Sequence, residues 1–230
     1  MPRIFVALSG GIDSTTCLAM AVKRFGARNI AAISFDYGQT HRVELDAARR
    51  VSDFYGVRHS IMELALGMGG LSDPSAVIPN VGYSELKGVS PSYVPFRNGN
   101  IISQLASIAA AKMHLDHASI EEPNRIYIGA HAEDAAGGAY PDCTMHFVGA
   151  MAAAVNIGTY GMVMLEAPLI NMVKHEIIQA AADLAAPLHL TRSCYSASVI
   201  QCGICPTCRA RKEGFKAANV MDPTTYQVPA

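Results

Sequence analysis

Short apolar runs alternate along the chain with stretches of helical periodicity. Runs rich in β-branched and aromatic residues predict buried strands. The predicted strands are 3–8, 29–35, 58–64, 125–130 and 161–167. Apolar residues that recur every three to four positions predict helices. The predicted helices are 13–26, 44–55, 101–113, 143–155 and 174–184. This alternation indicates an α/β fold, with a parallel sheet covered by helices on both faces.

Functional residues are expected in the segments that follow strands, because ligands of such sheets bind beyond the carboxyl ends of the strands. Residues 66–99 form a long connection rich in proline, glycine and serine. A connection of this length inside a compact domain is usually functional or disordered. The composition changes near Pro187, where a cysteine-rich tail begins. We therefore expect an α/β domain at 1–186 and a smaller segment at 187–230 packed on it.

The composition excludes several classes of protein. The chain has 230 residues, its net charge is −1 and its charged fraction is 16%. Without a basic excess, tight non-specific binding to nucleic acid is not expected. No apolar run is long enough for a membrane span, and glycines follow the first strand too soon for a signal peptide. We expect a cytoplasmic protein, in which clustered cysteines favour a metal site over disulfides.

The stretch "SGGIDS" (Ser9–Ser14) follows a predicted strand and opens a predicted helix. Unpaired N–H groups at the helix start, together with nearby hydroxyls, would suit a phosphate or pyrophosphate. The stretch is not a Walker A loop, because the Gly-Lys-Ser/Thr ending is missing. It is not the dinucleotide fingerprint either, because the spacing of its glycines is different. By themselves these residues fit equally well a plain strand–turn–helix connection, with Asp13 or Ser14 as the N-cap.

Most of the cysteines gather near the C-terminus. Their pattern, C-x7-C-x2-C-x2-C, is made by Cys194, Cys202, Cys205 and Cys208. Four thiolates with this spacing fit a closed, structural zinc site. An iron–sulfur cluster also takes four cysteines, and buried thiols without a metal are the third alternative. Cys17 and Cys143 lie elsewhere and are expected in helix packing or near the pocket.

"SGGIDS" after the first strand resembles the pyrophosphate loop of the N-type ATP pyrophosphatases, the PP-loop superfamily. Further stretches resemble the 7-cyano-7-deazaguanine synthases, the QueC family, from end to end. The stretches that carry this resemblance are "LSGGIDSTTCL" (8–18), "FDYGQTHRVEL" (35–45), "YVPFRN" (93–98), "YPDC" (140–143), "PLINMVKHEII" (168–178), "SCY" (193–195) and "CGICPTCRAR" (202–211). The resemblance implies a Rossmann-like, adenine nucleotide alpha hydrolase-like fold with a small zinc-binding segment.

The resemblance also implies a reaction and its partners. ATP would adenylate 7-carboxy-7-deazaguanine, and ammonia would displace AMP to give an amide. A second ATP would activate the amide oxygen, and elimination would leave the nitrile of 7-cyano-7-deazaguanine, in queuosine-type biosynthesis. ATP with Mg²⁺, a structural Zn²⁺ on the four cysteines, free ammonia and a homodimer are implied, with no membrane or direct nucleic-acid partner.

Residue roles follow from the matched stretches. The expected ATP-binding residues are Leu8, Ser9, Gly10, Gly11, Ile12, Asp13, Ser14, Thr15, Thr16, Cys17 and Leu18. Asp13 would help to place magnesium or else cap its helix. Arg97 would face the developing phosphate charge, which suits a guanidinium, or else tie its loop in a salt bridge. Lys174 would meet the ATP phosphates or else lie solvated on the surface.

The expected substrate-binding residues are Asp134, Tyr140 and Asp142, whose carboxylates could accept N–H groups of a deazaguanine. Both acids could equally form turns beside glycine and proline. The stretch after Asp134 is longer than in the family pattern, and Thr144 stands where arginine usually follows "YPDC". These departures leave open a different base or a reaction that stops at the amide.

His41, His131 and His146 are candidate bases, although isolated histidines are more often structural or exposed. Two other functions compete with the favoured one. The first is a different PP-loop ATP pyrophosphatase, such as a tRNA-modifying enzyme or an amide-forming ligase. The second is a zinc-ribbon module that binds nucleic acid or protein without catalysis, for which salt-sensitive RNA binding would be the sign.

Overall fold

The computed structural model describes residues 2–73, 75–79, 88–115 and 121–228. The strands of the described residues form one parallel sheet in the order β3-β2-β1-β4-β5. They are β1 (Ile4–Ala7), β2 (Ile30–Asp36), β3 (Arg58–Glu63), β4 (Asn124–Tyr127) and β5 (Val163–Glu166). Each corresponds to a strand predicted from the sequence. The predicted parallel α/β sheet is therefore confirmed.

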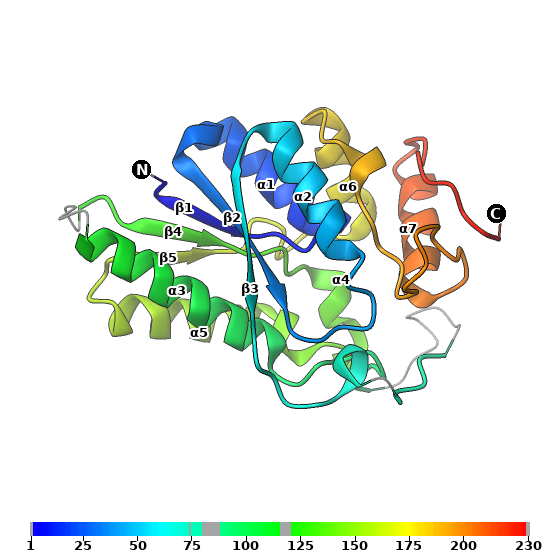
Figure 1. Ribbon diagram of the computed structural model, residues 1–230, viewed down its shortest axis with the longest axis horizontal. Coiled ribbons are helices and arrows are strands. Elements are labelled where there is room, and N and C mark those ends of the chain that lie inside the picture. Colours follow the sequence, from blue (N-terminus) through cyan, green and yellow to red (C-terminus); the bar gives the residue numbers. More distant parts are fainter. Residues whose placement is uncertain (1, 74, 80–87, 116–120, 229–230) are drawn as a thin grey trace.

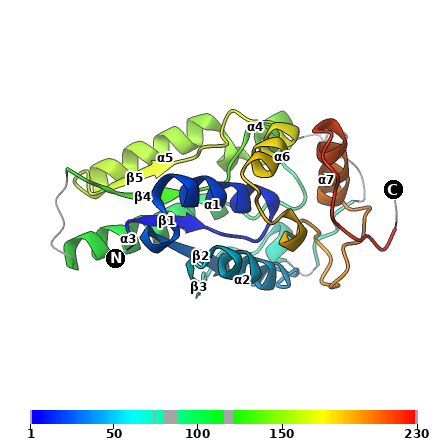
Figure 2. The same cartoon turned by 90° about the horizontal axis from the view of Figure 1, so that it is seen from above.

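Helices cover both faces of the sheet (Figure 1). One face carries α1 (Ile12–Phe25), α2 (Glu44–Tyr55) and α6 (Lys174–Asp183). The other carries α3 (Arg97–Leu115) and α5 (Met145–Gly158), and Figure 2 shows the two layers from above. The short α4 (Ala132–Ala135) follows β4, and α7 (Pro206–Ala217) packs beside α6. No helix within the described ranges is long and apolar enough to cross a membrane.

Alternation along β1 divides the hydrophobic core between the two faces. Ile4 and Val6 belong to the core under α1 and α6, whereas Phe5 belongs to the core under α3 and α5. Successive side chains of a strand point to opposite faces, so a short apolar run fills both layers. Phe215 of α7 is 1% exposed and lies in the same core as Ile4, so the C-terminal segment packs against the main sheet layer. The division at 186/187 itself stays a prediction.

The helix and strand ends differ from the predicted ones for local reasons. The helix expected at 143–155 begins only at Met145, because the Thr144 hydroxyl accepts a hydrogen bond from the Phe147 N–H at 3.1 Å and caps it. The strand expected to run to residue 130 ends at Tyr127. At Gly129 the chain passes so close to α1 that a Cβ would lie 3.1 Å from the Ser14 nitrogen. The helix expected at 101–113 begins four residues earlier, at Arg97.

The strand order places a crevice between β1 and β4. From β1 the chain proceeds to β2 and β3 on one side, and it later returns through β4 and β5 on the other. At such a switch point the loops beyond the carboxyl ends of the two strands diverge and leave room for a ligand. The loop after β1 contains Ser9, Gly10 and Gly11 and leads into the first turn of α1, and the loop after β4 contains Gly129, Ala130 and His131.

Gly10 is required by packing as well as by backbone conformation. Its φ is +86°, and a Cβ there would lie 2.5 Å from the Glu44 carbonyl oxygen and 2.6 Å from the Ala48 nitrogen of α2. We expect Gly10→Ala to lower the free energy of unfolding, measured by urea denaturation, by at least about 2 kcal/mol. Gly26→Ala is the control, because Gly26 has φ +78° but nothing within 4 Å of its Cβ position. Equal losses in both variants would contradict the packing argument.

Candidate functional site

A cavity of about 650 Å³ opens at the crevice between β1 and β4. Its walls come from the loops after β1, β2 and β4, the first turns of α3 and α6, and the C-terminal segment. A cavity of this size is typical of sites for nucleotides and other small molecules. Chain segments that are distant in the sequence therefore meet at one place, where the topology of the sheet predicts a ligand.

The start of α1 faces this cavity without a side-chain cap. Gly11 is the N-cap residue, and no side chain in the described part of the chain caps the first turn by a hydrogen bond. The Ser14 hydroxyl lies 3.0 Å from the Ser9 hydroxyl and accepts the Ser9 N–H at 3.2 Å, which closes the loop on itself. The alternative in which Asp13 or Ser14 caps the helix is therefore wrong. An uncapped helix start with adjacent hydroxyls can bind a phosphate group.

The predicted ATP-binding stretch divides into two parts. Leu8, Ser9, Gly11, Ile12, Asp13 and Ser14 line the cavity. Five other predicted residues do not line it, because the loop and the helix turn them toward α2 or into the core: Gly10, Thr15, Thr16, Cys17 and Leu18. The Cys17 thiol is fully buried and donates to the Ile128 carbonyl oxygen at 3.5 Å, and burial raises its pKa.

Charged side chains meet beside the start of α1. The Lys174 ammonium lies 2.7 Å from Asp13 Oδ1, so the alternative of a solvated surface lysine is wrong. His131 Nε2 lies 3.1 Å from Lys174 Nζ and 3.2 Å from Asp134 Oδ2. Burial alone would raise the pKa of Asp13, but Lys174 and His131 outweigh it and hold that pKa below its ordinary value. Burial opposes the charge on Lys174, yet Asp13 and Asp134 raise its pKa. The pair is therefore ionised at neutral pH.

Arg97 is the first residue of α3 and lines the same cavity. Its guanidinium donates to the Tyr37 hydroxyl at 3.4 Å. Within the described part of the chain no carboxylate lies within ion-pairing distance of it, so the predicted alternative of a loop-tying salt bridge is not found there. Burial lowers the pKa of Arg97, but interactions with Tyr37 and Cys143 outweigh burial and raise it. The cavity thus contains a cation that has no carboxylate of the described residues within ion-pairing distance.

Two of the three predicted substrate-binding residues line the cavity, and the third does not. Asp134 and Tyr140 are among its walls. Asp142 is 3% exposed, and its Oδ2 accepts the Asn98 N–H at 2.9 Å. Its carboxylate therefore holds the first turn of α3 and is not available to a ligand in the cavity. Tyr140 lies 3.1 Å, hydroxyl to hydroxyl, from Tyr195.

The three candidate histidines have different surroundings. His131 is completely buried among charged groups, and its Nδ1 has no hydrogen-bond partner among the residues that the structure describes. His41 lines the cavity and pairs with Glu44 at 3.0 Å. His146 is exposed on α5 and does not line the cavity. Several other polar residues that line the cavity were given no role from the sequence, among them Tyr37, Glu44, Arg192 and Tyr195. Their only signal was their position inside or beside the stretches that carry the resemblance.

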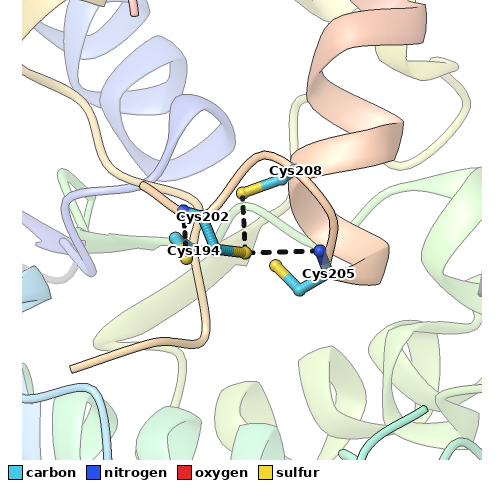
Figure 3. Close-up of side chains that lie close together, drawn as sticks. All are labelled: Cys194, Cys202, Cys205 and Cys208. Atoms are coloured by element: carbon cyan, nitrogen blue, oxygen red, sulfur yellow. Dashed lines mark hydrogen bonds between the residues drawn. The ribbon is translucent and has the colours of Figure 1, made fainter. Parts of the chain in front are cut away.

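The four clustered cysteines converge at the start of α7 (Figure 3). Their Sγ atoms all lie within 4.8 Å of one another. Zinc–sulfur bonds of about 2.3 Å place tetrahedral thiolates ~3.8 Å apart, so the set fits one ion after a small contraction. Backbone N–H groups of Ser196 and Cys202 both donate to Cys194 Sγ at 3.3 Å. The cluster could therefore hold a single metal ion such as zinc.

The comparisons with known proteins cover nearly the whole chain. A family profile described as queuosine biosynthesis protein QueC matches residues 3–219. A 7-cyano-7-deazaguanine synthase of Acetivibrio thermocellus is 36% identical over 233 residues, covering 98% of this chain and 98% of that one. A 7-cyano-7-deazaguanine synthase of Cupriavidus necator is 40% identical over 239 residues, covering 99% of each chain.

A solved structure of the U34-tRNA thiolase NcsA from Methanococcus maripaludis, with its 4Fe-4S cluster, is also similar. It has 16% sequence identity and a TM-score of 0.42, over 94% of this chain and 64% of that chain.

Proposed function

The chain belongs to the family of queuosine biosynthesis protein QueC, and we propose that it makes 7-cyano-7-deazaguanine from 7-carboxy-7-deazaguanine, ammonia and ATP. The names of its full-length relatives support the product. Use of ATP is supported by the observation that carries the proposal, which is the uncapped start of α1 facing the cavity beside Lys174. A cytoplasmic homodimer that uses free ammonia belongs to the same proposal.

The uncapped start of α1 suits the β- and γ-phosphates of ATP. Backbone N–H groups and the hydroxyls of Ser9 and Ser14 would hold the leaving pyrophosphate. Lys174 would stabilise the charge that develops on the phosphates, because a preorganised cation in a partly buried site needs little reorganisation during reaction. Asp13 would keep Lys174 in place, at the 2.7 Å distance of their ion pair, and help to position Mg²⁺.

Arg97 would bind the α-phosphate of ATP and the substrate oxygen that attacks it. A guanidinium matches the fork of phosphate oxygens, and this one keeps its donors without a carboxylate partner in the described residues. Tyr37 fixes its direction by a hydrogen bond of 3.4 Å. Tyr140 and Asp134 line the cavity and would contact the deazaguanine, whereas Asp142 would act only through Asn98.

The proposed reaction activates the same carbon twice. A carboxylate oxygen attacks the α-phosphorus of ATP and pyrophosphate leaves; ammonia then attacks the carbonyl carbon and AMP leaves with its electron pair. The amide oxygen attacks a second ATP, pyrophosphate leaves again, and loss of AMP and two amide protons gives the nitrile. Activation converts a poor leaving group into a good one, and the protein supplies alignment and charge. No covalent bond to the protein is needed.

The cysteine cluster has a structural role in this proposal. Its four thiolates would hold Zn²⁺, and no ligand position is left open for chemistry. When bound, the ion would fix the loop between Cys194 and Cys202 against the cavity, where Tyr195 lines the wall. The metal would therefore shape the site without taking part in the reaction.

Purified protein incubated with 7-carboxy-7-deazaguanine, Mg-ATP and ammonium tests the proposal by mass spectrometry. We expect the nitrile, with two AMP for each nitrile formed. An amide that accumulates without nitrile would contradict the second activation and would point to the loop that contains Asp134 and Thr144. No conversion by a protein that still binds ATP would overturn the substrate assignment.

A further inference from the structure

Arg192 lies at the junction between the phosphate-facing loop and the cysteine cluster. Its backbone N–H donates to the Gly10 carbonyl oxygen at 2.8 Å. Its own carbonyl oxygen lies 3.5 Å from the position that a Cβ on Gly11 would occupy. The main chain at Arg192 is thus in direct contact with the loop that precedes α1. The residue is 5% exposed and lines the cavity.

The side chain of Arg192 reaches the other way, into the loop between the first two cysteines. Its Nη1 donates to the Val199 carbonyl oxygen at 2.9 Å, and its Nη2 donates to the carbonyl oxygens of Ser196 and Ser198. No carboxylate of the described chain lies within ion-pairing distance of this guanidinium. A buried cation needs such partners, so its position depends on the three carbonyl groups.

Those carbonyl groups are in place only while the loop between Cys194 and Cys202 is closed. Both ends of that loop carry thiols of the cluster, and Ser196 N–H and Cys202 N–H bond to Cys194 Sγ. A metal ion bonded to the four sulfur atoms would tie the two ends of this loop together, and the loop loses that constraint when the ion is removed. Metal binding is therefore expected to close the loop around Arg192.

A second buried arginine fixes the chain on the other side of Arg192. Arg211 of α7 is 1% exposed, donates to the Thr191 hydroxyl at 2.8 Å and donates to the Leu188 carbonyl oxygen at 3.2 Å. It also pairs with Asp222 at 3.2 Å. The segment that contacts Gly10 is consequently held both by α7 and by the cysteine loop. A change at the cluster therefore has a short, continuous path to the start of α1.

We propose that Arg192 is a positioning residue that couples the cysteine cluster to the phosphate-facing loop, so that metal in the cluster raises the affinity of that loop for a nucleoside triphosphate. The inference rests on the proposed function, in which this loop binds ATP. The coupling acts through the position of the backbone. Arg192 contacts the phosphate-facing loop through its main chain and the cysteine loop through its side chain, so a shift of one loop moves the other. The structural metal thereby sets nucleotide binding as well as fold stability.

Calorimetric titration with magnesium α,β-methylene-ATP, which is not cleaved between the α- and β-phosphates, tests the coupling. Removing the metal from the wild-type chain with a chelator should weaken its Kd at least about fivefold, the low end of allosteric couplings. Arg192→Met should still hold metal but bind the analogue about as weakly as the metal-free wild-type chain. Metal removal should then lower the affinity of this variant little further. Arg192→Lys keeps the charge, but its side chain cannot reach all three carbonyl groups. Its Kd should therefore rise as it does in Arg192→Met.

Arg209→Met is the matched control. Arg209 also donates to a carbonyl group of the cysteine segment, that of Ile204 at 2.8 Å, but it is exposed and does not line the cavity. This variant should keep the wild-type Kd and its metal dependence. A metal-loaded Arg192→Met chain with the wild-type Kd would overturn the proposal. So would metal removal that lowers the affinity for the analogue equally in the wild-type chain and in Arg192→Met.

Hydrogen exchange separates this inference from the proposed function, because it needs no nucleotide. On metal removal, the amides of 8–18 should exchange faster in the wild-type chain, with little further change in Arg192→Met. If the wild-type chain binds no analogue, the proposed function fails. Unchanged exchange of 8–18 on metal removal would overturn the coupling itself.

Discussion

Replacing Lys174 with methionine is expected to lower the turnover of 7-carboxy-7-deazaguanine by about 100- to 1,000-fold, the range for losing one preorganised donor in an active site. The ammonium lies beside the uncapped start of α1 and pairs with Asp13 at 2.7 Å. Methionine keeps much of the side-chain volume but removes the charge. Steady-state release of AMP measures the loss, which should fall mainly on kcat because the charge on the phosphates grows toward the transition state.

Lys23→Met is the control for Lys174→Met. Lys23 is exposed in α1 and does not line the cavity, so its loss removes a charge without touching the site. Its turnover should equal that of the wild-type chain. Circular dichroism of both variants checks that the fold is kept. A folded Lys174→Met chain with more than about a tenth of wild-type turnover would contradict the role given to this lysine.

Replacing Cys208 with serine is expected to abolish stoichiometric zinc and to lower the free energy of unfolding by at least about 3 kcal/mol. Cys208 is completely buried in α7, and its Sγ lies 4.0 Å from that of Cys202. A hydroxyl is a poor ligand for zinc, so three thiolates remain without a closed site. Metal analysis and urea denaturation measure the two effects.

Cys17→Ser serves as the comparison for Cys208→Ser. Cys17 is equally buried but lies in α1, away from the cluster, so its loss changes packing without changing the ligands. This variant should keep one zinc per chain. A Cys208→Ser chain that retains stoichiometric zinc and wild-type stability would contradict the metal site, and a multi-iron spectrum in the wild-type chain would contradict zinc.

The fold was readable from the sequence because strand and helix periodicities are local. Apolar runs such as 3–8 supply both faces of a buried parallel strand, and helices must then cover both. Element ends were less readable, because they depend on tertiary contacts. β4 stops at Tyr127 since Gly129 must pass beside Ser14, and α5 starts after the hydroxyl of Thr144.

The candidate site was readable in part. Spacing alone predicted the convergence of the four cysteines, and the strand-to-helix loop predicted the position of Asp13. The burial of Asp142, whose carboxylate holds Asn98, was not readable from the sequence. For Cys17 the sequence left helix packing and the pocket open, and the residue lies in the core. Arg192 carried no signal beyond its position directly before "SCY", because its role depends on carbonyl groups that only the folded loop brings together.

The most direct test of adenylation follows oxygen-18 from a substrate labelled at both carboxylate oxygens. The proposed reaction transfers one labelled oxygen to AMP when the amide forms and the other to a second AMP when the nitrile forms. Mass spectrometry should therefore find all the AMP labelled, two labelled AMP for each nitrile and no labelled phosphate. Unlabelled AMP, or label released as water or phosphate, would contradict the activation of this oxygen beside the start of α1.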